Sequence, residues 1–135
     1  MSKIKIYPFR GYISSRPING NTIPQSLQNL KIRDFANTKK INFKLSITEY
    51  KMKNSFFGLN SLKKEIKSLG GVIFFSIHQL PSKKNLRENF LKFFLKKNKR
   101  IFFALEDIEL KSLLDVEEIE TIFFISKNSK KTLKI

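Results

Sequence analysis

The side chains that could do chemistry are concentrated in one polar segment near the amino terminus. This segment reads RGYISSRPINGNTIPQSLQNLKIRDF and spans residues 10–35. A hydroxyl beside a guanidinium can bind a phosphate or a carboxylate, together with N–H groups at the start of a following helix. We therefore expect this segment to form one wall of a ligand site. Its candidate ligand-binding residues are Arg10, Ser14, Arg16, Asn19, Asn21, Gln25 and Gln28.

Three residues are candidates for catalysis. Ser15 could act as a nucleophile if a neighbouring base removed its proton. His78, the single histidine of the chain, could be a general acid or base, and Glu49, which follows a predicted strand, could be a base. Each residue also has a structural interpretation: a serine bonded to turn backbone, a hydrogen-bonded structural histidine and an ordinary loop acid.

Further ligand contacts are expected beside these candidates. Tyr50 could stack on a sugar ring or a base, Gln79 follows the histidine, and Glu106 could supply an acid at the same edge. The alternative for Tyr50 is a tyrosine that covers the core, and the alternative for Gln25 and Gln28 is a place on the surface of a helix.

Composition excludes several kinds of site. The absence of cysteine rules out disulfides and thiolate chemistry, and a single histidine rules out a multi-histidine metal site. A carboxylate cation site stays open, although acidic residues are few. Gly11 and Gly20 do not form a dinucleotide-binding glycine pattern, and no phosphate-loop GK[ST] is present. We therefore expect neither a metal nor a cofactor.

The chain is strongly basic, with 27 Lys and Arg against 11 Asp and Glu and a formal charge of +16. Such a charge attracts nucleic acid, anionic lipid or a phosphorylated substrate. Coding bias is the alternative, because Lys, Asn, Ile and Phe are abundant together, as in proteins of AT-rich genomes. The basic residues spread over the whole length, so we favour coding bias and do not expect nucleic acid as a partner.

Hydrophobic patterning indicates strands that alternate with helices. GVIFFSI at 71–77 is a continuous apolar run, typical of a strand covered on both faces. The predicted strands are 9–14, 41–48, 71–77, 100–106 and 121–126, and the predicted helices are 22–38, 56–69 and 82–98, with a short helix or turn over 108–119.

Two of these helices have candidate N-caps, which are Asn21 or Thr22 for the first and Ser82 for the third. The first helix is expected to present an apolar face made of Leu27, Leu30, Ile32 and Phe35.

This order of elements predicts βαβ units with right-handed crossovers. We expect a single α/β domain over 1–135, built as a small three-layer sandwich with a mainly parallel sheet of four or five strands. The basic tail, 127–135, is expected to be frayed. Ligands bind at the carboxyl ends of the strands in such sheets. At that edge we expect four segments to converge: Ser14–Arg16, Thr48–Tyr50, His78–Gln79 and Glu106–Asp107.

No segment has the pattern of a signal peptide or a membrane span. MSKIKIYPFRGY, at the amino terminus, lacks an apolar run of signal-peptide length, and the longest apolar runs are too short to cross a bilayer. We therefore expect a soluble, cytoplasmic protein. The sequence does not give its oligomeric state, and a homodimer is one state that it allows.

Four blocks of the chain resemble those of the sporadic carbohydrate cluster family, small bacterial proteins of surface-polysaccharide gene clusters. The blocks are the long polar segment that opens at Arg10, then SITEYKM, GVIFFSIHQLP and FALED, and together they run over most of residues 9–107. The resemblance implies a role in polysaccharide or lipopolysaccharide synthesis, and it implies no defined reaction.

A more distant resemblance is to the catalytic domain of serine recombinases, in which a GYxRxS-like strand end leads into a helix with a Q-rich start. It implies a resolvase-like or flavodoxin-like sheet and the same site location. Aligned on Gly11–Tyr12, the family's arginine falls on Ser14 and its nucleophilic serine falls on Arg16, and Gln79 stands where a further arginine is expected. These departures argue against recombination.

Three functions follow from the sequence, and the first two are nearly balanced. The first is an enzyme acting on a sugar, nucleotide-sugar or lipid-linked sugar. The second is a non-catalytic module that binds a sugar phosphate or a pathway protein. The third, a DNA-binding relative of resolvases, ranks well behind.

Overall fold

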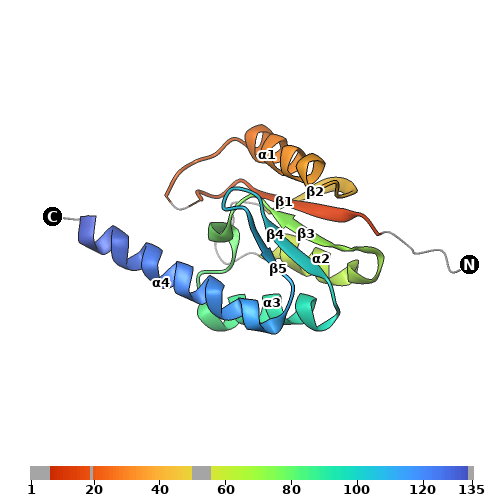
Figure 1. Cartoon of the computed structure of the whole chain (residues 1–135). Coiled ribbons are helices and arrows are strands. Elements are labelled where there is room, and N and C mark those ends of the chain that lie inside the picture. Colours follow the sequence, from red (N-terminus) through yellow and green to blue (C-terminus); the bar gives the residue numbers. More distant parts are fainter. Residues whose placement is uncertain (1–6, 19, 50–55, 134–135) are drawn as a thin grey trace, which may run out of the picture.

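Four strands alternate with helices and a fifth follows the fourth directly in the computed structural model, which describes residues 7–18, 20–49 and 56–133, the last eight of these by their backbone alone. The elements are β1 (Phe9–Ser14), α1 (Gln25–Thr38), β2 (Phe43–Glu49), α2 (Phe57–Lys64), β3 (Gly71–Phe74), α3 (Lys84–Lys96), β4 (Arg100–Phe103), β5 (Ile108–Leu110) and α4 (Val116–Leu133), with short 3₁₀ helices η1 (Ile66–Ser68), η2 (Ile77–Gln79) and η3 (Leu113–Asp115) (Figure 1).

The strands form one sheet in the order β2-β1-β3-β4-β5. β1 is parallel to β2 and β3, β3 is parallel to β4, and β5 is antiparallel to β4. The predicted mainly parallel sheet is therefore confirmed, in a flavodoxin-like order. The chain changes direction across the sheet between β1 and β3. In open α/β sheets this switch point leaves a crevice outside the strand ends, where ligands bind.

Helices on both faces of the sheet make the predicted three-layer sandwich (Figure 1). α1 covers one face, where Ile32 and Phe35 pack against Phe102 of β4. α2, α3 and the start of α4 cover the other face, where Phe74 of β3 stacks on Phe103 of β4. Each such side chain contributes about 1.5–3 kcal/mol when it is fully buried. The strand ends between these layers therefore have a rigid support.

β3 is shorter than predicted, and its end shapes the site. All four of its residues are buried, as expected of a central strand. The strand ends at Phe74, however, and 77–79 form η2 instead of its continuation. Ser76 caps this turn through its side chain, which accepts from the backbone N–H of His78. This turn keeps His78 near the edge of the sheet where the parallel strands have their carboxyl ends.

Two predictions for the last third of the chain are wrong. Residues 121–126, predicted as a strand, lie within α4, and the fifth strand is β5, in a stretch predicted as a helix or turn. An apolar run such as Ile122–Ile125 fits either element by itself. Val116 and Ile119 precede it at helical spacing and are buried in the core, so the helix buries more apolar surface.

The backbone of α4 continues as a helix to Leu133, so it includes most of the basic tail 127–135. No helix in the part of the chain that the structure describes is long and apolar enough to cross a membrane.

The predicted helix caps are also wrong. Pro24 and Lys83 precede α1 and α3, and neither of these two helices has a side-chain cap from Asn21, Thr22 or Ser82. The other elements are present with ends shifted by a few residues, and the predicted helix 56–69 divides into α2 and η1.

The buried face of α1 differs from the predicted one. Ile32 and Phe35 are buried as expected, whereas Leu27 and Leu30 are exposed. Gln28 is fully buried on the same helix, in a polar network at the end of β1. At the first turns of α1 the hydrogen bonds of Gln28, and not the apolar spacing, therefore determine which face of the helix is buried.

Candidate functional site

A cavity of about 180 Å³ opens at the switch point between β1 and β3. We call it the switch-point cavity. Its walls come from the loop after β1, from the start of the α2 region and from the segment that leads from η2 to α3. The residues that line it are Ser14, Arg16, Pro17, Ile18, Phe56, His78, Gln79, Leu80, Pro81 and Ser82.

The volume of this cavity limits what it can hold. Pockets for drug-sized ligands measure roughly 300–1,000 Å³. The switch-point cavity is smaller, so it suits a small group or one end of a larger molecule.

Arg16 supplies positive charge to the cavity. Its guanidinium lies 5.4 Å from the ring centroid of Phe56, and its Nη2 donates to the hydroxyl of Tyr12 at 3.5 Å. Among the described residues no carboxylate forms an ion pair with Arg16. Within the described part of the chain, most of its donors therefore lack a carboxylate partner and can face an anionic ligand.

Ser14 adds a hydroxyl to the same cavity. Its Oγ accepts from Nε2 of Gln79 at 3.1 Å, and no described residue accepts the hydroxyl hydrogen. The side chain is nearly fully buried and fixed by this bond. A ligand atom in the cavity could therefore receive a hydrogen bond from Ser14.

Gln28 and Gln79 act as positioning residues. Gln28 bonds both backbone groups of Ser14, accepting from its N–H at 2.9 Å and donating to its carbonyl at 2.8 Å. Gln79 donates to Oε1 of Gln28 and accepts from the backbone N–H of Ser76. This buried network ties the end of β1 to η2. Because the partners of Gln28 are all within the protein, it has no capacity left for a ligand.

His78 lines the cavity from the other side. Its ring meets the ring of Phe123 on α4, with 5.8 Å between centroids in an edge-on arrangement. The turn that carries it is fixed by Glu106, which accepts from the hydroxyl of Ser76 at 2.7 Å and from the N–H of Ile77 at 3.0 Å. Glu106 is therefore a structural acid beneath η2, and it does not line the cavity.

Glu49 is committed to the protein as well. It is fully buried and accepts from the hydroxyl of Tyr12 at 2.8 Å and from the backbone N–H groups of Gly58 and Leu59 at the start of α2. A side chain at position 58 would meet this carboxylate, because a Cβ built there lies 2.9 Å from Oε2 of Glu49. The arrangement anchors α2 to the end of β2.

The hydroxyl of Tyr12 is strongly perturbed by this environment. Burial raises its pKa well above the usual value, the adjacent Glu49 raises it further, and Arg16 opposes the shift. Tyr12 therefore remains a neutral donor to Glu49.

The remaining candidates lie outside the cavity. Ser15 donates to the backbone carbonyl of Glu49 at 3.4 Å, away from the cavity lining. Arg10, on β1, forms an ion pair with Glu65 at 3.0 Å. Asn21 forms a backbone bridge with Ile18, and the side chain of Gln25 is exposed. Asn19 and Tyr50 lie outside the described residues.

The structure thus brings together four of the candidates, which are Ser14, Arg16, His78 and Gln79. The sequence did not point to Phe56 or Phe123, which touch Arg16 and His78. Both aromatics come from other elements, and no local spacing signals their place.

The arrangement can bind an anion through a guanidinium and a hydroxyl. Among the described residues, no group of three or more His, Cys, Asp or Glu side chains is placed to hold a metal ion. In comparisons with known proteins, no protein-family model matches the sequence, and no curated protein is significantly similar to it.

Proposed function

We propose that the protein binds the phosphate of a phosphorylated carbohydrate in the switch-point cavity, acting in the cytoplasm in the synthesis of surface polysaccharide or lipopolysaccharide. The observation that supports a phosphate is Arg16, a half-buried cation in the cavity wall with no carboxylate partner among the described residues. The carbohydrate and the pathway rest on the resemblance of residues 9–107 to the sporadic carbohydrate cluster family.

Binding is favoured over covalent catalysis by the positions of the other candidates. The hydroxyl of Ser15 donates to a backbone carbonyl, and the carboxylate of Glu49 already accepts from three donors. A nucleophile needs a base within hydrogen-bond reach. Neither residue lines the cavity, so the nucleophile and base inferred from the sequence do not enter the proposal.

The test is calorimetric titration with a hexose 1-phosphate, a hexose 6-phosphate and the unphosphorylated hexose. We expect the phosphates to bind and the free sugar to bind at least tenfold more weakly. Arg16→Gln should weaken phosphate binding about 10- to 100-fold, because a charge-assisted hydrogen bond contributes about 1.5–3 kcal/mol.

Arg33→Gln is the matched control, because Arg33 is exposed on α1 and the substitution removes the same charge. Arg16→Lys keeps the charge and loses the fork of donors, so it should give an intermediate affinity. Equal affinities for wild type, Arg16→Gln and Arg33→Gln would refute the phosphate site.

A catalytic function is the second candidate, and His78 in the cavity wall is the observation that favours it. An imidazole beside a bound sugar phosphate can act as a general acid or base. Mass spectrometry of candidate sugar phosphates incubated with the protein would detect turnover. If the protein is an enzyme, His78→Gln should abolish the product while phosphate binding persists.

A further inference from the structure

A second, larger hollow lies beside the switch-point cavity, between the start of α3 and the middle of α4. It has a volume of about 660 Å³. We call it the α3–α4 groove. Its lining residues are Ser82, Lys84, Arg87, Glu120, Phe123 and Phe124.

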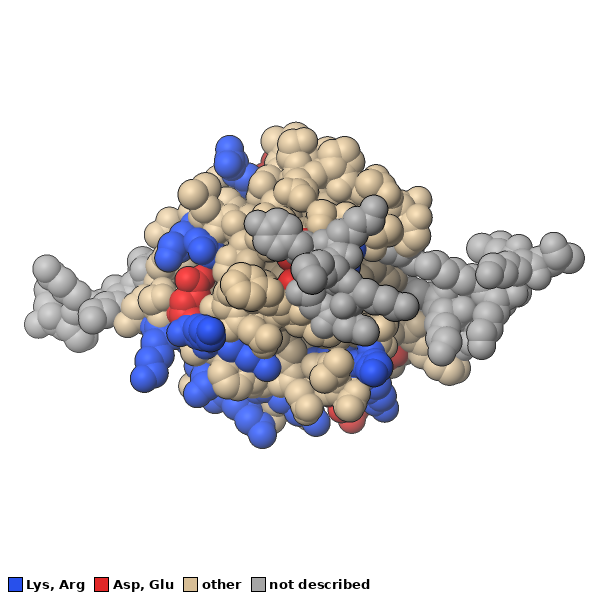
Figure 2. Space-filling view, turned by 180° about the vertical axis from the view of Figure 1, so that it is seen from behind, with Lys and Arg blue, Asp and Glu red and all other residues tan. Residues whose placement is uncertain are grey.

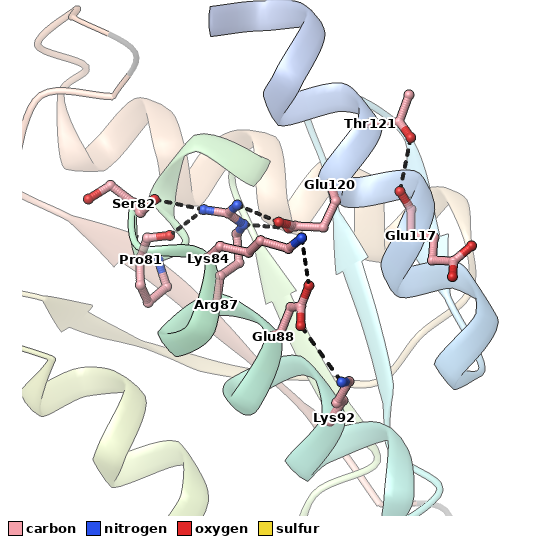
Figure 3. Close-up of polar contacts among 9 residues, drawn as sticks. All are labelled: Pro81, Ser82, Lys84, Arg87, Glu88, Lys92, Glu117, Glu120 and Thr121. Carbon is pink, nitrogen blue, oxygen red and sulfur yellow. Dashed lines mark hydrogen bonds and ion pairs between the residues drawn. The ribbon is translucent and has the colours of Figure 1, made fainter.

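The charged residues of the groove are engaged with one another. Figure 3 shows the guanidinium of Arg87 between Glu120 on α4 and the backbone carbonyls of Pro81 and Ser82. Nε and Nη2 of Arg87 donate to Glu120 at 2.7 and 2.6 Å, and Nη1 donates to the two carbonyls at 3.0 and 2.9 Å. The charge of Arg87 is therefore neutralised inside the protein.

Aromatic side chains provide the free surface of the groove. The guanidinium of Arg87 lies 4.0 Å from the ring centroid of Phe123, which covers its face. Phe124 is 68% exposed. Lys84 pairs with Glu88 on the same helix, although at 3.8 Å this surface pair is weak. Among the described residues, a ligand in the groove would therefore meet apolar rings and the ammonium of Lys84.

The groove and the switch-point cavity adjoin. Ser82 lines both of them. Phe123 lines the groove and touches His78, which lines the cavity. One molecule could therefore place an anionic end beside Arg16 and pass over Ser82 into apolar surroundings.

We propose that the natural ligand is amphiphilic, a sugar phosphate joined through its phosphate to a long apolar chain. The head occupies the switch-point cavity and the chain lies in the α3–α4 groove against Phe123 and Phe124. This inference rests on the proposed function, because the head is the phosphate that Arg16 binds. It narrows the ligand class from phosphorylated sugars in general to lipid-linked ones.

A series of isoprenyl monophosphates tests the chain without changing the head. Dimethylallyl, geranyl and farnesyl phosphate are titrated below their aggregation limits. We expect affinity to rise with chain length, by at least tenfold from the first to the third, since each added unit buries apolar surface. Phe124→Ser should remove most of this increase, and it should lower the affinity for farnesyl phosphate far more than the affinity for dimethylallyl phosphate.

Leu30→Ser is the matched control. Leu30 is 64% exposed on α1, on the opposite face of the sheet, and its loss removes similar apolar surface without touching the groove. It should leave the dependence on chain length intact.

The outcomes separate the two proposals. Phosphate binding that depends on Arg16 but not on chain length overturns the lipid chain and preserves the proposed function. If no isoprenyl phosphate and no sugar phosphate binds, both proposals fail. A dimer that Phe124→Ser converts to a monomer, with no effect of chain length, would identify a second copy as the occupant and overturn the lipid chain.

Discussion

Gln28 shows how a single side chain can organise the candidate site. It is fully buried, and its amide bonds Ser14, Gln79 and the carbonyl of Ile23. Buried polar groups of the backbone are costly when they lose their partners. The position of Ser14 in the cavity wall therefore depends on a residue that never touches the ligand.

Replacing Gln28 with Met, which has a similar length, should destabilise the protein by about 2–4 kcal/mol, because two backbone groups of Ser14 lose their partners. Urea denaturation would measure the loss. Gln25→Met, on the exposed side of the same helix, is the control and should change stability by about 0.5 kcal/mol or less. Equal stabilities of the two variants would contradict the assigned role.

Tyr12 predicts a pH dependence of stability. Its pKa is raised in the folded protein, mainly by burial, while the unfolded chain has the ordinary value of about 10. Below about pH 10 both states hold the proton. Above it the unfolded state releases the proton first, so the stability that Tyr12 contributes falls as pH rises.

Tyr12→Phe should remove this part of the slope between pH 9 and pH 11, although it lowers stability at pH 8 by about 1–3 kcal/mol because Glu49 loses a buried donor. Urea denaturation at a series of pH values would compare the two proteins. A parallel decline in both would show that Tyr12 does not cause the slope.

Only part of the site could be predicted from the sequence, because sequence patterns reveal strand ends but not long-range hydrogen bonds. Ser14, Arg16 and His78 follow strands, and parallel strands end at one edge, so the sequence indicates their convergence. Glu49 also follows a strand, yet its carboxylate is drawn to Tyr12 and to the start of α2. Such long-range hydrogen bonds leave no periodic trace in the sequence.

At the scale of elements, a prediction is clearest where a segment fits only one type of secondary structure. GVIFF, around β3, is too short for a helix and apolar throughout, so a buried strand was the only good interpretation. TIFFIS, predicted as a strand, lies in α4, because the same residues also fit a helix. The choice depends on α3, which offers Arg87 to Glu120 and an apolar surface to the start of α4.

The pairing of Arg87 with Glu120 should be a main determinant of how α4 is attached. Both side chains are largely buried, so Glu120→Ala leaves a buried cation without its carboxylate and should cost about 3 kcal/mol. Glu117→Ala, on the exposed side of α4, should have little effect. Denaturation would give the stabilities, and hydrogen exchange should show faster exchange within α4 of Glu120→Ala alone.

Charge acts at the scale of the whole molecule. Lys and Arg side chains gather along the lower part of the face in Figure 2, on the side of the molecule where α3 lies. With a formal charge of +16, like charges repel one another in the compact state. Salt screens this repulsion over a distance of about 10 Å at 0.1 M ionic strength.

We therefore expect the melting temperature to rise between 20 and 200 mM sodium chloride. Phosphate at equal ionic strength should raise it further, because an anion that binds the folded state alone stabilises it. Arg16→Gln should lose the additional effect of phosphate and keep the effect of chloride. A melting temperature that falls with salt would contradict self-repulsion as the dominant charge effect.

α4 is attached to the rest of the protein only through its first half, among the residues whose side chains the structure describes, so a small tilt there would move its far end by a larger distance. Figure 1 shows its far end reaching beyond the layers of the sandwich, while the contact between Arg87 and Glu120 lies close to the pivot. From Phe123, which still packs against the core, to Leu133 the helix runs roughly 15 Å at about 1.5 Å per residue, so a tilt of about 10° would swing its tip by roughly 3 Å. A small readjustment beside Ser82 would thus be magnified at the tip, where a fluorescent label could report it.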